Sequence, residues 1–92
     1  MMDLLTINMS KQFKRDLKKI KKQNKDIELL RKVIDILANN CELDITYNNH
    51  KLSGDYCGYF ELHLKPDWLL IYQIINKSEL YLVRTGRHSE LF

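Results

Sequence analysis

The sequence predicts an α+β fold, in which a hairpin of two N-terminal helices packs on a small twisted antiparallel β-sheet. Three observations support this prediction. Apolar residues recur with helical spacing in two segments of the first 38 residues. After Gly54 they alternate every second position, and a continuous apolar run then follows. A chain of 92 residues is expected to form a single domain, covering residues 1–92.

The first half of the chain predicts a short strand and two helices. Residues 4–9 have strand-like content, and Ser10 can cap the helix that follows. That helix ends at Gln23-Asn24, and its narrow apolar stripe consists of Phe13, Leu17 and Ile20. A second helix is expected over residues 26–38, and its buried face consists of Ile27, Leu30, Val33, Ile34 and Leu37.

The second half of the chain predicts a loop followed by three strands. Residues 41–55 are polar and turn-rich, which indicates a loop. The next strand runs to about Leu64, and one of its faces consists of Tyr56, Gly58, Phe60, Leu62 and Leu64. Residues 68–75 are nearly all apolar, as expected of a central strand. A third strand is expected over residues 80–84, and residues 85–92 form a short turn or strand ending.

Composition excludes several classes of protein. With 45% hydrophobic and 29% charged residues, the chain is neither disordered nor of low complexity. Its longest apolar run, Trp68 to Tyr72, is far too short to span a membrane. The N-terminus lacks the pattern of a secretion signal, so Cys41 and Cys57 are expected to be reduced. We therefore expect a cytoplasmic protein that has no membrane partner.

Positive charge is concentrated in one segment. Residues 11–25 contain eight basic residues and one acid, Asp16, so this segment carries +7 while the rest of the chain carries −4. Such a field favours a polyanionic partner, although a lysine-rich helix face that is simply solvated would give the same pattern. The residues expected to bind such a polyanion are Lys11, Lys14, Arg15, Lys18, Lys19 and Lys22.

Residues capable of chemistry gather in the last 43 positions. The three histidines, His50, His63 and His88, lie in loops or near strand ends. Taken singly, each could be an ordinary surface or hydrogen-bonded residue. The histidines are 13 and 25 positions apart, which is not a metal-ligand spacing, so neither a metal nor another cofactor is expected. Motifs of serine hydrolases, nucleotide-binding proteins and dehydrogenases are absent from the sequence.

RNA cleavage is one reaction that suits histidine, aspartate and arginine without a metal. RNA carries its own nucleophile, the 2′-hydroxyl, so the protein needs a base, an acid and a cation. Histidine can serve as base or acid near neutral pH. The arginine fork suits phosphate oxygens. An aromatic ring such as that of Trp68 can stack on an unpaired base, although a bulky aromatic can equally be core packing.

Three segments of the sequence make a resemblance specific. They are NNHKLSG (residues 48–54), ELHLKPDWLLIY (residues 61–72) and VRTGRHSELF (residues 83–92). Together with the lysine-rich N-terminal segment, they resemble the YafQ-like toxins of the RelE/ParE superfamily over essentially the whole chain. This resemblance implies a RelE-like fold and a ribosome-dependent endoribonuclease that cuts messenger RNA. It also implies a neutralising antitoxin as a partner.

The resemblance also implies an active site. The matching positions are His50, His63, Asp67, Trp68, Arg84, His88 and Phe92. We expect His88 to be the general acid and Arg84 to stabilise the phosphate in the transition state. The general base and the groups that position it are expected among His50, His63 and Asp67. The sequence does not decide which of the three takes the proton of the 2′-hydroxyl. The residues expected to contact the nucleotide are Trp68, Arg87 and Phe92.

Two other functions remain open on the sequence. ParE-like toxins of the same superfamily poison DNA gyrase and cut no RNA, but such an inhibitor has no need of the His/Asp/Arg set. A plain nucleic-acid-binding module would explain only the +7 segment, and would bind without turnover. Base preference, strict dependence on the ribosome and the identity of the antitoxin are not encoded in these residues.

Overall fold

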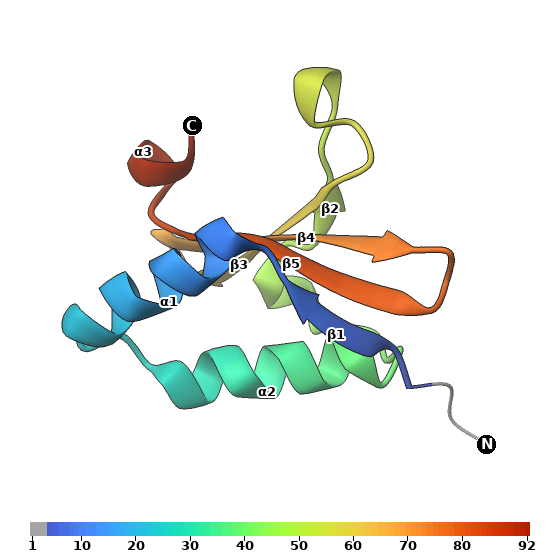
Figure 1. Ribbon diagram of the computed structural model, residues 1–92, viewed down its shortest axis with the longest axis horizontal. Helices are drawn as coiled ribbons and strands as arrows, with labels where there is room; N and C mark the ends of the chain where they lie inside the picture. Colours follow the sequence, from blue (N-terminus) through green and yellow to red (C-terminus); the bar gives the residue numbers. More distant parts are fainter. Residues whose placement is uncertain (1–3) are drawn as a thin grey trace.

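A computed structural model describes residues 4–92 and confirms the α+β prediction (Figure 1). Two long helices lie on one side of a five-stranded sheet, and a short C-terminal helix lies on the other. In chain order the elements are β1 (Thr6–Met9), α1 (Lys11–Lys22), α2 (Ile27–Ala38), the 3₁₀ turn η1 (Ile45–Tyr47), β2 (His50–Lys51), the 3₁₀ turn η2 (Gly54–Tyr56), β3 (Phe60–Lys65), β4 (Trp68–Ile75), β5 (Glu79–Gly86) and α3 (His88–Leu91).

The first helix, α1, begins after its predicted cap, Ser10, and both long helices are capped at their N-termini. The Ser10 side chain accepts a hydrogen bond from the backbone N–H of Phe13 (2.9 Å), and its hydroxyl donates to the carbonyl of Val83 (2.7 Å). Asp26 caps α2 by accepting from the N–H of Leu29 (3.1 Å). Each cap satisfies an N–H that would otherwise lack a partner in the first helical turn. Ser10 therefore also ties the start of α1 to β5.

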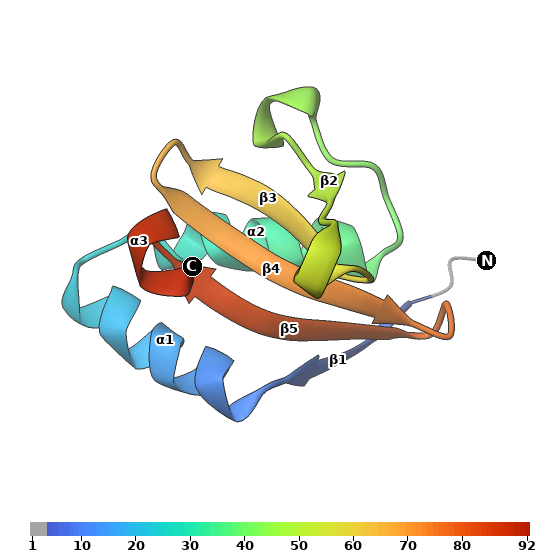
Figure 2. The same cartoon turned by 90° about the horizontal axis from the view of Figure 1, so that it is seen from above.

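The sheet is mixed, which corrects the antiparallel expectation. Its order is β1-β5-β4-β3-β2. Strands β2 to β5 pair antiparallel, but β1 pairs parallel with β5, with Thr6 opposite Glu79. The reason is topological: the chain leaves β1 through both helices, and β5 then returns beside β1 in the same direction (Figure 2). β1 is consequently an edge strand.

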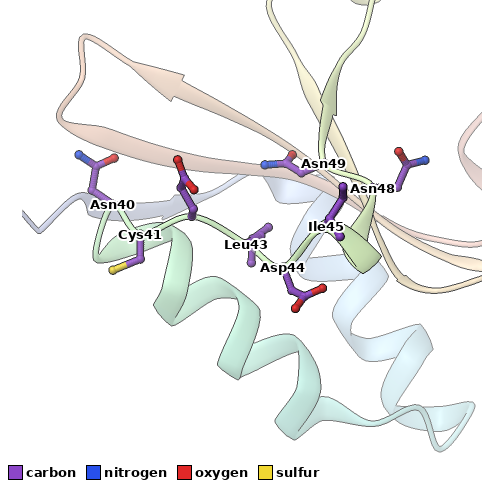
Figure 3. A pocket seen from close by; sticks show the side chains of 8 residues that line it. Asn40, Cys41, Leu43, Asp44, Ile45, Asn48 and Asn49 are labelled. Carbon is purple, nitrogen blue, oxygen red and sulfur yellow. The ribbon is translucent and has the colours of Figure 1, made fainter.

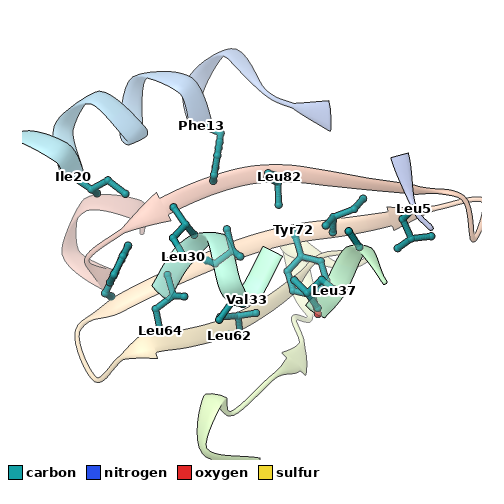
Figure 4. Close-up of a cluster of buried hydrophobic side chains, with 14 residues drawn as sticks. Leu5, Phe13, Ile20, Leu30, Val33, Leu37, Leu62, Leu64, Tyr72 and Leu82 are labelled. Carbon is teal, nitrogen blue, oxygen red and sulfur yellow. The ribbon is translucent and has the colours of Figure 1, made fainter. Parts of the chain in front are cut away.

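The main core lies between the two long helices and the sheet (Figure 4). Side chains from α1, α2 and the helix-facing side of the strands meet there, and full burial of each large apolar group stabilises the fold by about 1.5–3 kcal/mol. The expected helix stripes are confirmed at the centre of this core by Phe13, Ile20, Leu30 and Val33. Leu17, Ile27 and Ile34 pack at its margin.

The opposite side of the sheet, called here the open face, is only partly covered. A small apolar cluster on it consists of Leu69, Ile71 and Leu91, with Leu52, Tyr59 and Val83 packed against them. Figure 1 shows α3 and the β2–η2 segment standing on this side. We call α3 and the β2–η2 segment the two walls of the open face.

The strand borders differ from the predicted ones for local reasons. The segment expected to be a loop contains η1, the two-residue strand β2 and η2. β3 starts at Phe60 and not at Tyr56, because Gly58 has φ +96° and the N–H of Tyr59 bonds back to the carbonyl of Tyr56 (3.1 Å). β5 extends to Gly86, and the tail forms α3. No helix within residues 4–92 is long and apolar enough to cross a membrane.

Candidate functional site

Two histidines meet one carboxylate on the open face. His50 on β2 lies directly opposite Glu61 on β3, and Glu61 lies opposite Ile71 on β4. The Oε1 of Glu61 is 3.5 Å from Nε2 of His50 and 3.6 Å from Nε2 of His63. Glu61 is only 7% exposed, whereas both rings are partly open to solvent. A carboxylate held in this position can stabilise positive charge on either ring.

The backbone before β2 fixes the orientation of His50. Asn48 adopts a left-handed conformation (φ 48°), and its carbonyl lies 2.7 Å from Nδ1 of His50. A carbonyl only accepts, so Nδ1 carries the hydrogen and Nε2 of the neutral ring carries the lone pair. Asn49 is held by the buried hydroxyl of Tyr72, which donates to its Oδ1 (2.8 Å). Burial raises the pKa of Tyr72, so this hydroxyl stays a donor.

Arg84 reaches the open face because β5 contains a bulge. Ile71 pairs with Arg84 and Tyr72 pairs with Leu82, so Val83 is the extra residue. Without the bulge, simple alternation would place Arg84 on the core side with Leu82. The bulge instead puts Arg84 in the same cross-strand row as His50, Glu61 and Ile71.

Asp16, the lone acid of the basic segment, holds Arg84. Its carboxylate accepts from Nε (2.8 Å) and Nη2 (3.3 Å) of Arg84, and from the N–H of Thr85 (3.1 Å). Asp16 is 6% exposed, whereas the Arg84 side chain is 29% exposed. The guanidinium is thus oriented from one side and retains N–H groups for a phosphate.

Trp68 belongs to the core. It is 2% exposed and lies in the cluster beneath the helices. Its Nε1 donates to the hydroxyl of Thr85 (2.9 Å), and that hydroxyl donates to the carbonyl of Leu69 (2.8 Å). No ring face is left for an RNA base, so we correct the expected role of Trp68 from base stacking to packing.

The C-terminal helix brings His88 and Phe92 to one wall of the open face. Both side chains are exposed, and their ring centroids are 4.9 Å apart. Phe92 also meets Tyr56 of the opposite wall edge-to-face, with centroids 5.2 Å apart and planes at 79°. Between the walls lies a hollow of about 300 Å³, lined by Asp55, Tyr56, Tyr59, Ile71, Val83, Arg84 and Leu91. Phe92 is therefore exposed beside this hollow and is not part of the core.

Glu90 anchors α3 to α1. Its side chain forms an ion pair with Lys19, and its Oε1 accepts from the N–H of Arg87 (2.9 Å) and lies 3.7 Å from Nε of Arg87. The hydrogen bond from Lys19, followed by that from the Arg87 backbone, lowers the pKa of Glu90 from 4.5 to about 2. Arg87, expected to contact the nucleotide, thus helps to hold α3 in place while its own side chain stays half exposed.

Asp67 lies two residues before Leu69, the partner of His63 in the β3–β4 pairing. It is exposed in the turn that joins β3 and β4. Because Leu69 pairs with both His63 and Gly86, this turn lies at the same end of the sheet as α3 (Figure 2). Asp67 thus borders the end of the site at which His88 lies.

The basic surface of α1 flanks the site. All six basic residues expected to contact RNA are exposed: Lys11, Lys14, Arg15, Lys18, Lys19 and Lys22. Lys19 joins α1 to α3 through Glu90. Arg15, Lys19 and Arg84 line a hollow of about 160 Å³ between α1 and the end of β5. The helix thus extends the positive charge of Arg84 along the edge of the molecule.

A larger hollow of about 480 Å³ lies elsewhere, along the segment between α2 and β2 (Figure 3). It is lined by amides and by the acids Glu42 and Asp44, and by none of the histidines. Hydrogen bonds from Thr46 keep the pKa of Asp44 below its ordinary value of 3.8. Its negative charge is unsuited to a phosphate backbone, so this hollow is not the site.

Within the described range, residues 4–92, no group of three or more histidine, cysteine, aspartate or glutamate side chains is arranged to hold a metal ion. Cys41 and Cys57 are both exposed and unpaired in disulfides, in agreement with the expectation. The cluster of His50, Glu61 and His63 is suited instead to acid–base chemistry.

Three residues of the site were missed by the sequence analysis. Glu61 and His63 are two positions apart on the polar side of an alternating strand, and this pattern could have revealed Glu61. Asp16 was visible as the one acid among eight basic residues. Tyr56 was assigned to a strand face, and only the turn of the chain at η2 shows that it is exposed.

Comparison with known proteins gives a consistent result. The family model described as "Bacterial toxin of type II toxin-antitoxin system, YafQ" matches residues 5–92. The Escherichia coli K12 protein named "mRNA interferase toxin YafQ" is 39% identical over 87 residues, covering 94% of each chain.

Two solved structures show the same likeness. A structure described as a metal-bound toxin from Helicobacter pylori is 48% identical, with a TM-score of 0.90, and covers 97% of this chain and 100% of that chain. The toxin in the E. coli DinJ–YafQ toxin–antitoxin complex is 37% identical, with a TM-score of 0.88, and the match covers 97% of this chain and 98% of that chain.

Proposed function

The chain belongs to the YafQ family of bacterial toxins of type II toxin–antitoxin systems, and we propose that it is a metal-independent endoribonuclease that cuts messenger RNA on the ribosome. The observation that carries this proposal is the cross-strand row on the open face. His50 and Glu61, with His63 beside them, lie in register with Arg84. A base, a charge-stabilising carboxylate and a phosphate-binding cation therefore share one surface.

The reaction needs only the RNA and these side chains. Nε2 of His50, which carries the lone pair, takes the proton of the 2′-hydroxyl, and Glu61 stabilises the resulting imidazolium. The 2′-oxygen then forms a bond to phosphorus, and the bond from phosphorus to the 5′-oxygen breaks. Arg84 binds the charged phosphate oxygens. His88 gives its proton to the leaving 5′-oxygen, so the products are a 2′,3′-cyclic phosphate and a 5′-hydroxyl.

His63 and Asp67 complete the proposed site. His63 shares Oε1 of Glu61 with His50, so it is the second candidate for the base and positions the carboxylate. Asp67 and Arg87 border the end of the site at which His88 lies, where they position His88 and the nucleotide. No protein-bound metal takes part in the step, since acid, base and cation are all supplied by side chains.

The proposed partners follow from the charge distribution and from the relatives. The exposed basic residues of α1 bind the backbone of messenger and ribosomal RNA, and we propose that the protein acts in the cytoplasm. Lys18→Glu combined with Lys22→Glu should lower the salt slope of ribosome binding by about 1.5. Lys32→Glu with Lys77→Glu, both exposed and outside α1, is the control. Equal slopes in the two double variants would remove α1 from the interface.

An antitoxin is the second proposed partner. The crystallised E. coli relative forms a complex with its antitoxin DinJ. We propose that this chain is likewise neutralised by a cognate antitoxin. Co-expression with its antitoxin should restore growth of cells that produce the toxin, and a restored culture should yield the two chains as one complex on gel filtration.

The nucleophile provides a direct test. Programmed ribosomes would receive a messenger in which one residue, 5′ to the cut, carries a 2′-deoxyribose. Cleavage at that position should stop while cleavage of the all-ribose messenger continues. If the deoxy messenger is cut equally well, the attacking oxygen is water and the proposed mechanism is wrong.

A further inference from the structure

We propose that Tyr56 and the hollow beside it form a subsite for one unpaired base of the RNA. This inference rests on the proposed function, because it takes RNA as the substrate. The hollow lies on the open face between η2 and α3, and Arg84 lines it. A nucleotide whose phosphate binds Arg84 can therefore place its base in the hollow.

The floor of the hollow is apolar and close to the proposed catalytic row. Ile71 lies between Glu61 and Arg84 in that row, and Val83 is the bulge residue beside Arg84. Leu91 of α3 completes the floor, and Tyr59 stands at its side. The volume of about 300 Å³ is at the lower end of the range of small-molecule sites, which suits one base better than a peptide.

Two exposed aromatic rings stand beside this floor. Tyr56 is 42% exposed and Phe92 is 46% exposed, although each could be buried at a gain in stability. Their edge-to-face contact fixes the plane of Tyr56, and Phe92 in turn contacts His88. Every nucleobase has a flat face that stacks on such a ring. A base on Tyr56 is thereby held next to the proposed general acid.

The charges around the hollow separate base from phosphate. Asp55 is exposed and lines the hollow near Tyr56, so it repels a phosphate but admits a neutral base. Arg84 attracts the phosphate. This pair of opposite charges orients one nucleotide with its base toward η2 and its phosphate toward β5.

The test compares two RNAs and four proteins. The first RNA is a short single strand that is 2′-O-methylated throughout and cannot be cut by its own 2′-oxygen. The second has the same backbone without bases. Each is titrated against wild type, Tyr56→Leu, Tyr56→Phe and Tyr81→Leu. Tyr81 is the matched control. It alternates with the buried residues Leu80 and Leu82, so it lies on the open face, but it is nearer the β4–β5 turn than the hollow is.

Wild type should bind the base-bearing RNA about 5- to 150-fold more tightly than the abasic one. Tyr56→Leu should lose this preference, Tyr56→Phe should keep it, and Tyr81→Leu should keep it. Equal binding of both RNAs by wild type, or an undiminished preference in Tyr56→Leu, would overturn the subsite. A protein that shows the preference but cuts no ribose RNA would retain the subsite and refute the proposed catalytic function.

Discussion

Removing the carboxylate of Asp16 should weaken both the fold and the site. Asp16 is buried and satisfies the N–H of Thr85 together with two N–H groups of Arg84. In Asp16→Ala the buried N–H of Thr85 loses its partner, which costs about 2 kcal/mol. The ion pair with the partly exposed Arg84 adds about 1 kcal/mol. The expected loss in the free energy of unfolding is therefore about 3 kcal/mol.

Asp16→Asn separates the two contributions. Its amide oxygen, in the place of Oδ2, can still accept from the N–H of Thr85 and from Nε of Arg84, but the negative charge is lost. Its NH₂ group, in the place of Oδ1, faces Nη2 of Arg84 and cannot accept from it. We expect a loss of about 1–2 kcal/mol, between wild type and Asp16→Ala. Both variants should also lower kcat, because Arg84 loses the group that orients it.

Urea unfolding at neutral pH measures these values. For a domain of this size, 3 kcal/mol also corresponds to a Tm lower by roughly 12–24 °C. The control is Glu28→Gln on α2, whose pair with Arg31 spans 3.9 Å between exposed side chains and should contribute under about 0.5 kcal/mol. If Asp16→Ala costs no more than this control, the buried network does not stabilise the protein.

Three further variants test other parts of the structure. Glu90 has a pKa of about 2 in the folded protein against 4.5 ordinarily, so its pairing with Lys19 stabilises fully above about pH 4.5 and is lost as the pH falls towards 2. Because Lys19 is exposed, Glu90→Gln should remove only about 1 kcal/mol near pH 7 and flatten the acid limb of the stability curve; an unchanged limb would contradict this. Gly86 has φ +154°, and an added Cβ would lie 3.2 Å from Oε1 of Glu90. Gly86→Ala should therefore shift α3 and lower the free energy of unfolding, measured by thermal unfolding, by about 1–3 kcal/mol. A variant as stable as wild type would show that the backbone adapts. Tyr72→Phe keeps the stack on Phe60 but loses the hydrogen bond to Asn49, so it should cost about 1 kcal/mol and lower kcat with KM unchanged; an unaltered kcat would separate Asn49 from the positioning of His50.

Periodicity and capping were sufficient to predict the two long helices and the three longer strands, but not β2, the 3₁₀ turns or α3. The helical stripes, the cap at Ser10 and the alternation around Leu62 each depend on residues close together in the chain. The parallel pairing of β1 with β5 could not be predicted in this way. It joins positions more than 70 residues apart, and short edge strands carry little pattern of their own.

The candidate site, too, was predictable where local sequence patterns determine it and not where the three-dimensional fold does. The chemistry of histidine and arginine and the family motifs identified His50, His63, Arg84 and His88. The orientation of Arg84 depends on a bulge, which no alternation pattern announces. The same assumption of regular alternation placed Tyr56 in a strand. From the sequence, Trp68 could either stack on an RNA base or pack in the core. Only its burial and its hydrogen bond to Thr85, between the sheet and the helices, decide between the two.

The most direct test of the account is a cleavage assay with metal-stripped protein. Wild type and His88→Ala would be treated with EDTA, dialysed, and added to Mg²⁺-stabilised ribosomes programmed with a defined messenger, and to the same messenger alone. We predict new 5′-hydroxyl ends with stripped wild type on ribosomes, and a loss of at least about 100-fold in rate with His88→Ala. Activity that returns only on adding a transition metal, or 5′-phosphate ends, would contradict the metal-independent mechanism. Growth arrest without any cut RNA would refute the ribonuclease itself and direct the search to gyrase.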